Sequence, residues 1–300
     1  MLKNIQYKIK YVNFIVVIIL VLLPINSFAD SPIKVHVSIL PQQYFVEKIG
    51  KDKVIVDVMV KPGKSPATYA PLPDQIKKLG MSDIYFKIGV PFETTILHKI
   101  KSINNTIIII DTNKDVVLRN IKNHNHATTS DHDNYNIAGK DPHTWMNPLI
   151  VKKQAYTILQ ALLKISPNMG ITTKQELNRN YTEFIMELDK LDKKLKTILK
   201  KVKTKTIFVF HPFMGYFADA YGLQQIAIET MGKTPKAKDL SRIIKLAKKE
   251  NIKKIFVQSQ FDKNAATKIA SAINGSVISI DPLAYDYINN MKKIAETIVR

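Results

Sequence analysis

The sequence predicts an α/β protein of two lobes, each with a mainly parallel sheet, joined by one long rigid helix. Two observations support this fold class. Apolar runs rich in β-branched residues alternate with segments of helical period in both halves of the chain, which is typical of βαβ units. A segment of about 30 residues without glycine or proline separates the two halves, and its amphipathic pattern predicts a single helix.

The first lobe is expected over residues 30–172 and begins with a strand. Strands are predicted at 33–40, 54–60, 84–88 and 106–111, and helices at 42–49, 74–81 and 92–103. Because strands and helices alternate, we expect the strands to lie parallel.

The second lobe is expected over residues 203–300 and repeats the pattern. Strands are predicted at 206–210, 223–228, 254–258 and 277–280, and helices at 213–221, 238–250, 263–274 and 286–299. Each half is long enough to bury a core of its own.

The segment 173–202 is predicted to be the helix that links the lobes. Its apolar positions are spaced three and four residues apart, at Tyr181, Phe184, Ile185, Leu188, Leu191, Leu195 and Ile198. At ~1.5 Å per residue such a helix is roughly 45 Å long. One continuous helix resists bending, so we expect only small rotations of the lobes.

Residues 1–29 have the pattern of an export signal. Lysines near the start precede an apolar run at 14–23, and Ser27-Phe28-Ala29 forms a small-x-small cleavage site. The apolar run is too short for a membrane anchor, which needs ~20 residues. We therefore expect cleavage after Ala29 and a periplasmic protein.

Composition narrows the possible partners. The chain has no cysteine, which excludes disulfides and a lipidated cysteine, and its formal net charge is +20. The lysines are spread over predicted helix faces without interleaved aromatic residues, so we interpret the charge as solvated surface and not as a nucleic-acid site. We expect a monomer.

The segment 122–140 is polar and has no period, so it is predicted to be a loop. It carries His124, His126 and His132 among aspartates and asparagines. These histidines are possible auxiliary metal ligands, although a solubilising insertion is the alternative.

Three other residues are the main candidates for metal ligands. His143 follows Asp-Pro and precedes Thr-Trp-Met-Asn-Pro, His211 follows the apolar run 207–210, and Asp281 follows the apolar run 277–280. Ligand sites of α/β proteins gather where strands end. Taken one at a time, His143 could be a surface turn residue, His211 a core residue, and Asp281 a helix N-cap.

Together, two imidazoles and one carboxylate form a ligand set that suits zinc and can also hold manganese or iron. The chain shows no His-Glu-x-x-His motif, which is typical of one class of zinc hydrolases. A hydrolase with an open zinc position and an envelope adhesin remain as alternative functions.

At these residues the chain resembles the metal-binding substrate-binding proteins of zinc and manganese ABC transporters, the ZnuA and TroA type. The matching blocks are 38–41, 62–69, 141–148, 211–213, 232–235, 258–261 and 281–283. The resemblance implies two lobes joined by a rigid helix and no enzymatic activity. It also implies that the metal, Zn2+ or alternatively Mn2+, is a transported ligand that is delivered to a membrane permease. It also implies that His143, His211 and Asp281 are the second, third and fourth ligands.

The chain departs from the family pattern at the first ligand. The usual Pro-His-Thr-Tyr-Glu reads here Pro-Ala-Thr-Tyr-Ala, with Ala67 in the place of the histidine. Alanine cannot coordinate a metal. Water, one of the loop histidines or an unidentified neighbour could fill the position.

Overall fold

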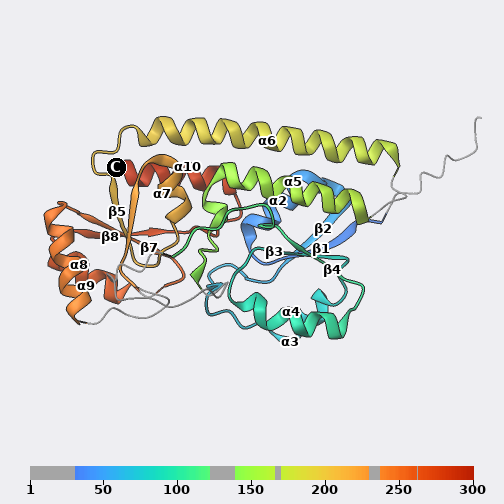
Figure 1. The fold of residues 1–300 in the computed structure, drawn as a ribbon, viewed down its shortest axis with the longest axis horizontal. Coiled ribbons are helices and arrows are strands. Elements are labelled where there is room, and N and C mark those ends of the chain that lie inside the picture. Colours follow the sequence, from blue (N-terminus) through green and yellow to red (C-terminus); the bar gives the residue numbers. More distant parts are fainter. Residues whose placement is uncertain (1–30, 122–138, 166–169, 230–236, 262) are drawn as a thin grey trace, which may run out of the picture. The chain divides into compact units, whose positions relative to one another are not determined.

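The computed structural model describes residues 31–121, 139–165, 170–229, 237–261 and 263–300. The expected export signal, the three loop histidines and the block 232–235 lie outside the described residues. Residues Pro32–Arg300 form one compact unit that contains two parallel sheets (Figure 1).

The first sheet lies in the N-terminal half and has the strand order β2-β1-β3-β4. Its strands are β1 (Ile33–Val37), β2 (Val54–Val58), β3 (Ile84–Lys87) and β4 (Ile108–Asp111). Three helices alternate with them, namely α2 (Leu40–Gly50), α3 (Pro73–Leu79) and α4 (Phe92–Ile103), and the 3-10 turn Lys51–Lys53 follows α2. All pairings are parallel, as predicted.

The second sheet repeats this arrangement with the order β6-β5-β7-β8. Its strands are β5 (Thr206–Val209), β6 (Gln224–Ala227), β7 (Lys254–Gln258) and β8 (Ser276–Ile280), and its helices are α7 (Gly215–Tyr221), α8 (Ala237–Lys249), α9 (Asn264–Ala272) and α10 (Tyr287–Val299). Strand β5 is central, so its carboxyl end lies in the middle of one sheet edge.

Along the chain, two long helices follow the last strand of the first sheet and precede the first strand of the second sheet. The second of these helices is the predicted linker. Helix α5 (Pro148–Ile165) begins at a proline, which the first turn of a helix tolerates. Helix α6 (Ile171–Leu199) runs for 29 residues and packs against α2, α5 and α10. It therefore contacts helices of both halves, and the predicted long helix is confirmed with ends two or three residues earlier than expected.

The core is shared by the two halves. One buried cluster joins the first sheet and α6 to residues of the second sheet such as Ile207 and Ile280. Another covers the opposite face of the second sheet, around Phe208 and Ile255. Ile207 and Phe208 belong to different clusters because neighbouring strand residues point to opposite faces. The sequence predicted a separate core in each half. Only the cluster around Phe208 and Ile255 belongs to one half alone, whereas the larger cluster is shared by both halves.

Some predicted boundaries were wrong at the strand ends. The first strand ends at Val37 instead of Leu40, because Leu40 already opens α2 with Pro41 in its first turn. Helix α7 begins at Gly215 instead of Phe213, because the Phe213 amide donates to the His211 carbonyl in a tight turn.

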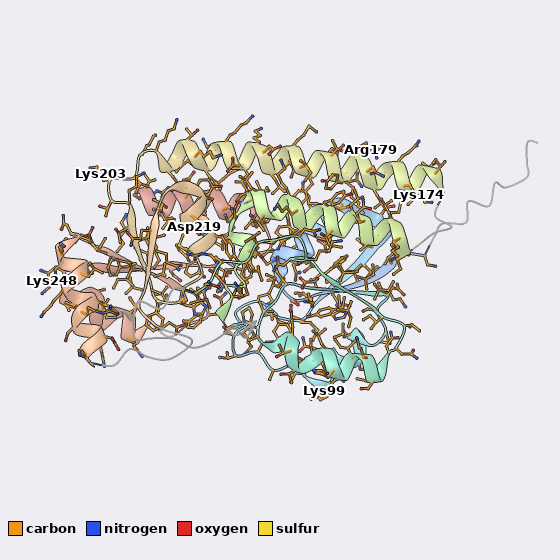
Figure 2. The ribbon with its side chains drawn as sticks, viewed as in Figure 1. Lys99, Lys174, Arg179, Lys203, Asp219 and Lys248 are labelled. Carbon is orange, nitrogen blue, oxygen red and sulfur yellow. The ribbon has the colours of Figure 1, made fainter. Side chains whose placement is uncertain are left out.

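Basic side chains are distributed over several elements of the described chain. Figure 2 shows Lys99 on α4, Arg179 on α6 and Lys248 on α8, far apart along the molecule. No helix in the described ranges is long and apolar enough to cross a bilayer.

Candidate metal site

His143 is held in a buried turn before α5. It precedes the 3-10 turn Thr144–Met146 and is 8% exposed. The Gln154 side chain of α5 fixes this turn, because its amide donates to Thr144 Oγ1 at 2.9 Å and to Asn113 Oδ1 at 2.7 Å. The ring of His143 lies 5.1 Å from the buried Trp145 ring. His143 is therefore not a mobile surface residue.

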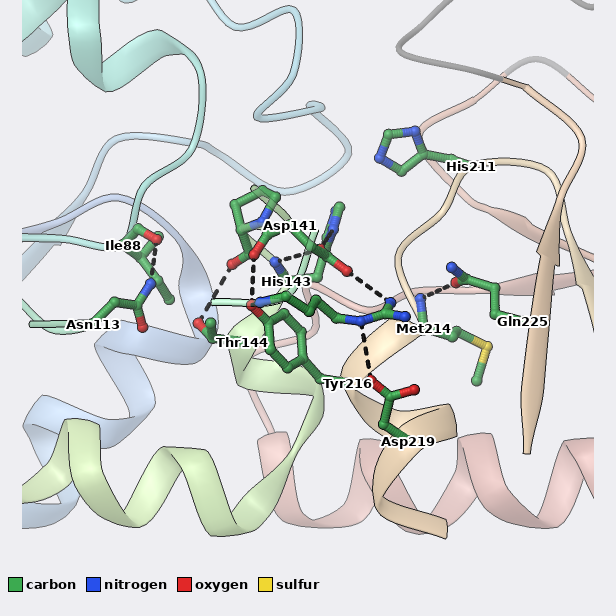
Figure 3. Close-up of polar contacts among 12 residues, drawn as sticks. Ile88, Asn113, Asp141, His143, Thr144, His211, Met214, Tyr216, Asp219 and Gln225 are labelled. Atoms are coloured by element: carbon green, nitrogen blue, oxygen red, sulfur yellow. Dashed lines mark hydrogen bonds and ion pairs between the residues drawn. The ribbon is translucent and has the colours of Figure 1, made fainter. Parts of the chain in front are cut away.

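The carboxylate of Asp141 sets the orientation of the His143 ring (Figure 3). Asp141 Oδ1 lies 2.7 Å from Nδ1 of the ring and accepts from the His143 backbone amide at 3.0 Å. Burial raises the pKa of Asp141, but hydrogen bonds with His143 and the charge of Arg119 outweigh it and hold the pKa below its usual value. An ionised carboxylate at Nδ1 favours the tautomer whose proton is on Nδ1, which leaves a lone pair on Nε2.

His211 is placed two residues after the central strand β5. Its Nδ1 atom contacts the carboxylate of Glu229, which follows β6 and is 5% exposed. The ring of Phe261 stacks on it at 4.9 Å. Burial lowers the pKa of His211 below its ordinary value, although the Glu229 carboxylate opposes the shift. A lowered pKa favours the neutral imidazole, which is the form that binds a metal.

The structure brings the two predicted histidines together. The ring centroids of His143 and His211 are 5.2 Å apart, at an angle of 73°. In both, a carboxylate occupies Nδ1, so Nε2 is the nitrogen left to coordinate a cation. A carboxylate behind a histidine is the usual support of a zinc ligand, because it fixes the ring and raises its basicity.

Asp281 does not complete this pair. Within the described chain, no three His, Asp or Glu side chains form a group that could hold a metal. Asp281 Oδ1 accepts from Gln260 Nε2 at 2.8 Å and from the Leu283 amide at 2.9 Å. The neighbouring Pro282 carbonyl accepts from the indole of Trp145 at 2.9 Å, which anchors this segment to that of His143. Asp281 as a ligand stays a prediction.

The alternative interpretation of Asp281 as a helix N-cap is wrong. Helix α10 begins at Tyr287, and its N-cap is Asp286, whose carboxylate accepts from the Asn289 amide.

Ala67 lies in the segment between β2 and α3. It is exposed, and its amide donates to Ser65 Oγ at 3.3 Å. Two residues later, the Tyr69 hydroxyl donates to the Met59 carbonyl at 2.5 Å and its ring packs on Phe92 at 5.2 Å. The backbone around Ala67 is thus anchored, although its side chain has no donor atom.

The segment with the three loop histidines starts and ends next to Asp141. Asn120 and Lys140 form an antiparallel bridge, the Ile121 amide donates to the Gly139 carbonyl at 2.8 Å, and the Asp141 amide donates to Arg119 at 2.9 Å. His124, His126 and His132 themselves lie outside the described residues.

Sequence reasoning missed the two carboxylates behind the histidines. Asp141 stood in a block already singled out, and its position two residues before His143 was a usable signal. Glu229 follows the apolar run 223–228 and so shares the sheet edge with His211. The rule that placed His211 at a strand end therefore also applied to Glu229.

Comparisons with known proteins identify the family of the chain. The family model described as "Zinc-uptake complex component A periplasmic" matches residues 35–300. The high-affinity zinc uptake system protein ZnuA of Bacillus subtilis is 26% identical over 249 residues, covering 81% of this chain and 76% of that protein. ZnuA of Yersinia pestis is 24% identical over 302 residues, covering 93% and 94%.

Solved structures of zinc-binding proteins share the fold of this chain. A crystal structure of ZnuA is 34% identical, with a TM-score of 0.81, and covers 90% of this chain and 98% of its own. The periplasmic zinc-binding protein TroA of Treponema pallidum shares the fold, with a TM-score of 0.77 at 17% identity and coverage of 90% and 98%. The matched length and the sequence identity show that this chain belongs to the family of the periplasmic zinc-uptake complex component A, ZnuA.

Proposed function

We propose that this chain binds a zinc ion between His143 and His211 and delivers it to the membrane permease of an ABC importer. The observation that carries the proposal is the pair of neighbouring imidazoles, one from each half of the chain, each with a carboxylate at Nδ1. Both rings are thereby prepared to donate from Nε2 to one cation.

Zinc is the cation that this donor set fits best. Nitrogen donors suit zinc, and Asp281 could add an oxygen donor if its carboxylate exchanged its contacts with Gln260 and Leu283 for the metal. Manganese and iron are the alternatives within the same family type. Three protein ligands would leave one position for water or another donor, since Ala67 supplies none.

Family membership makes the chain a solute-binding protein and not an enzyme. The hydrolase alternative is therefore not favoured.

The family also implies an exported protein. We propose that the export signal is removed after Ala29, which sequencing of the mature N-terminus would test, since it should begin at Asp30. We further propose that the lobes comprise residues 30–172 and 203–300, that α6 links them, and that the protein acts as a monomer. Elution of the purified protein from a sizing column at twice the mass of one chain would contradict the last point.

The proposed function is tested by metal analysis and by uptake. Protein purified without an affinity tag should contain about one zinc per chain, and deleting its gene should slow growth only when zinc is scarce. The wild-type gene should restore growth, whereas the double variant His143→Ala, His211→Ala should not. Full rescue by the double variant, or manganese in place of zinc in the purified protein, would contradict the proposal.

A further inference from the structure

Arg119 lies between two carboxylates from different parts of the chain. Its Nη1 atom donates to Asp141 Oδ2 at 3.1 Å, and its Nε atom forms an ion pair with Asp219 Oδ2 at 3.1 Å. The side chain is only 18% exposed. Asp141 is the residue that orients His143, and Asp219 belongs to α7, the helix that follows His211 (Figure 3). Arg119 therefore connects the surroundings of the two histidines.

Tyr216 holds Arg119 in this position from the α7 side. The Arg119 amide donates to the Tyr216 hydroxyl at 3.0 Å, and that hydroxyl donates to the Asp141 carbonyl at 2.9 Å. The guanidinium carbon lies 5.7 Å from the centre of the Tyr216 ring, within the range of a cation–π contact.

Gly215 makes room for the guanidinium. A Cβ atom on Gly215 would lie 1.3 Å from Nη1 of Arg119 and 2.7 Å from Oδ2 of Asp141. Any other residue at 215 must therefore displace the guanidinium from its place beside Asp141. The first residue of α7 is thus fitted to Arg119.

The two oxygens of Asp141 are divided between two tasks. Oδ1 forms a hydrogen bond with Nδ1 of His143, and Oδ2 accepts a hydrogen bond from Arg119. Asp141 is 1% exposed, so without Arg119 its Oδ2 would be a buried charged atom without a charged partner. Such an atom is costly, and the carboxylate is expected to turn away from His143 to find another partner.

We propose that Arg119 is a positioning residue of the metal site, which keeps Asp141 on Nδ1 of His143 and connects it to the helix that follows His211. The proposal rests on the proposed zinc capture and adds a residue that neither touches the metal nor supplies a ligand. Without Arg119, the His143 ring loses its fixed tautomer and its spacing to His211.

The test compares Arg119→Gln, Arg119→Lys and the control Arg179→Gln, an exposed arginine on α6. Zinc affinity is measured by competition with a chelating dye. We expect Arg119→Gln to weaken zinc binding by ~10- to 100-fold, the range for residues behind metal ligands. We expect Arg119→Lys to lose less, because an ammonium can still pair with Asp141 but not with both carboxylates. Arg179→Gln should bind like the wild type.

Nitrogen-15 spectra of the His143 ring in metal-free protein separate positioning from general stability. The wild type should show the Nδ1-protonated tautomer alone, and Arg119→Gln should show a mixture of both tautomers. An unchanged tautomer, or unchanged zinc affinity in Arg119→Gln, would overturn the proposal.

Gly215→Ala provides a second variant in which Arg119 is retained. It should weaken zinc binding and mix the tautomers of His143, because the new methyl group displaces the guanidinium. Wild-type affinity in Gly215→Ala would contradict the proposal, even if Arg119→Gln failed to fold.

His143→Ala and His211→Ala, measured in parallel, separate the two claims. If both lose zinc binding while Arg119→Gln keeps it, the positioning role fails and the proposed function stands. If neither loses binding, the proposed function fails. The tautomer of His143 in metal-free protein reports on Arg119 in either case.

Discussion

The Nδ1 atom of His143 lies 2.7 Å from Oδ1 of Asp141, only two residues earlier in the chain. The same carboxylate oxygen accepts the backbone amide of His143. The Asp-Pro-His sequence thus places the proposed ligand and the carboxylate that orients it in one turn. His211 contacts a carboxylate in the same way, but its partner Glu229 lies just after the adjacent strand β6 and not in the same turn.

The relationship predicts the effect of Asp141→Asn. The asparagine keeps the shape of the side chain but removes the charge, so His143 is held less firmly and is less basic. Zinc affinity should fall by ~10- to 100-fold, as measured by competition titration. Asp115→Asn, at an exposed aspartate, is the matched control and should change nothing. Equal affinities for the two variants would show that Asp141 does not support a ligand.

The missing first ligand gives a second prediction. Ala67→His adds a nitrogen donor to an anchored backbone position, so it should tighten zinc binding if water now fills the gap. The gain in affinity is measured against Ala67→Gln, which has a similar size but no imidazole. Equal affinities for these two variants would show that an imidazole at residue 67 does not join the metal site.

The loop histidines are tested separately. Closing a segment of about 19 residues over the site costs conformational entropy, so we expect the triple change of His124, His126 and His132 to alanine to reduce zinc affinity only modestly. A loss as large as that of His143→Ala would instead show that the loop supplies an essential ligand.

Most of the fold could be predicted from the sequence because each element carries a local signal. The strands read as short apolar runs, and α6 reads as a long amphipathic pattern without breakers. The positions of helix starts were less certain, as at Leu40 and Gly215, because they depend on turns that form after a strand ends. The shared core was not predictable, since the pattern shows which residues are buried but not what they contact.

The candidate site was predicted in part. His143 and His211 stand in recognisable blocks, and the place of His211 follows from the rule that strand ends gather ligands. His143 lies in the turn before α5 and not at a strand end, so its approach to His211 depends on tertiary packing. Asp281 carries the same signal, yet its carboxylate contacts Gln260 in the structure. The role of Arg119 was not predictable, because its partners Asp141 and Asp219 are 22 and 100 positions away and only tertiary packing unites them.

Glu93 makes the stability of the N-terminal half depend on pH. Its carboxylate accepts from Ser38 Oγ at 2.5 Å and from the amides of Ile88 and Gly89 at 2.8 and 2.7 Å. Burial raises its pKa from 4.5 to about 7, although these hydrogen bonds oppose the shift. A raised carboxyl pKa means that its favourable contribution is full below pH 4.5 and is lost as the pH rises to about 7.

We therefore expect Glu93→Gln to change the pH profile of unfolding. Between about pH 4.5 and 7 the wild type should lose on the order of 3 kcal/mol relative to the variant. Urea unfolding at intervals from pH 4.5 to 8 measures this difference. His36, whose pKa is lowered to about 4 by burial, titrates in the same range but is common to both proteins and cancels. If the unfolding free energies of the wild type and Glu93→Gln changed in parallel with pH, Glu93 would not have the raised pKa.

The continuity of α6 predicts little movement on metal binding. The helix has no internal glycine or proline at which to kink, and it packs against helices of both halves. Small-angle scattering should give nearly the same radius of gyration with and without zinc. A change of several ångströms would show that the halves open widely.

The most direct test of the metal site is a zinc titration of the wild type, His143→Ala and His211→Ala in competition with a chelating dye. His98→Ala, at an exposed histidine of α4, is the control. The wild type and the control should bind one zinc with equal affinity. Each site variant should lose more than the ~100-fold that an outer partner can account for. Wild-type affinity in both site variants would contradict a site built on these two histidines.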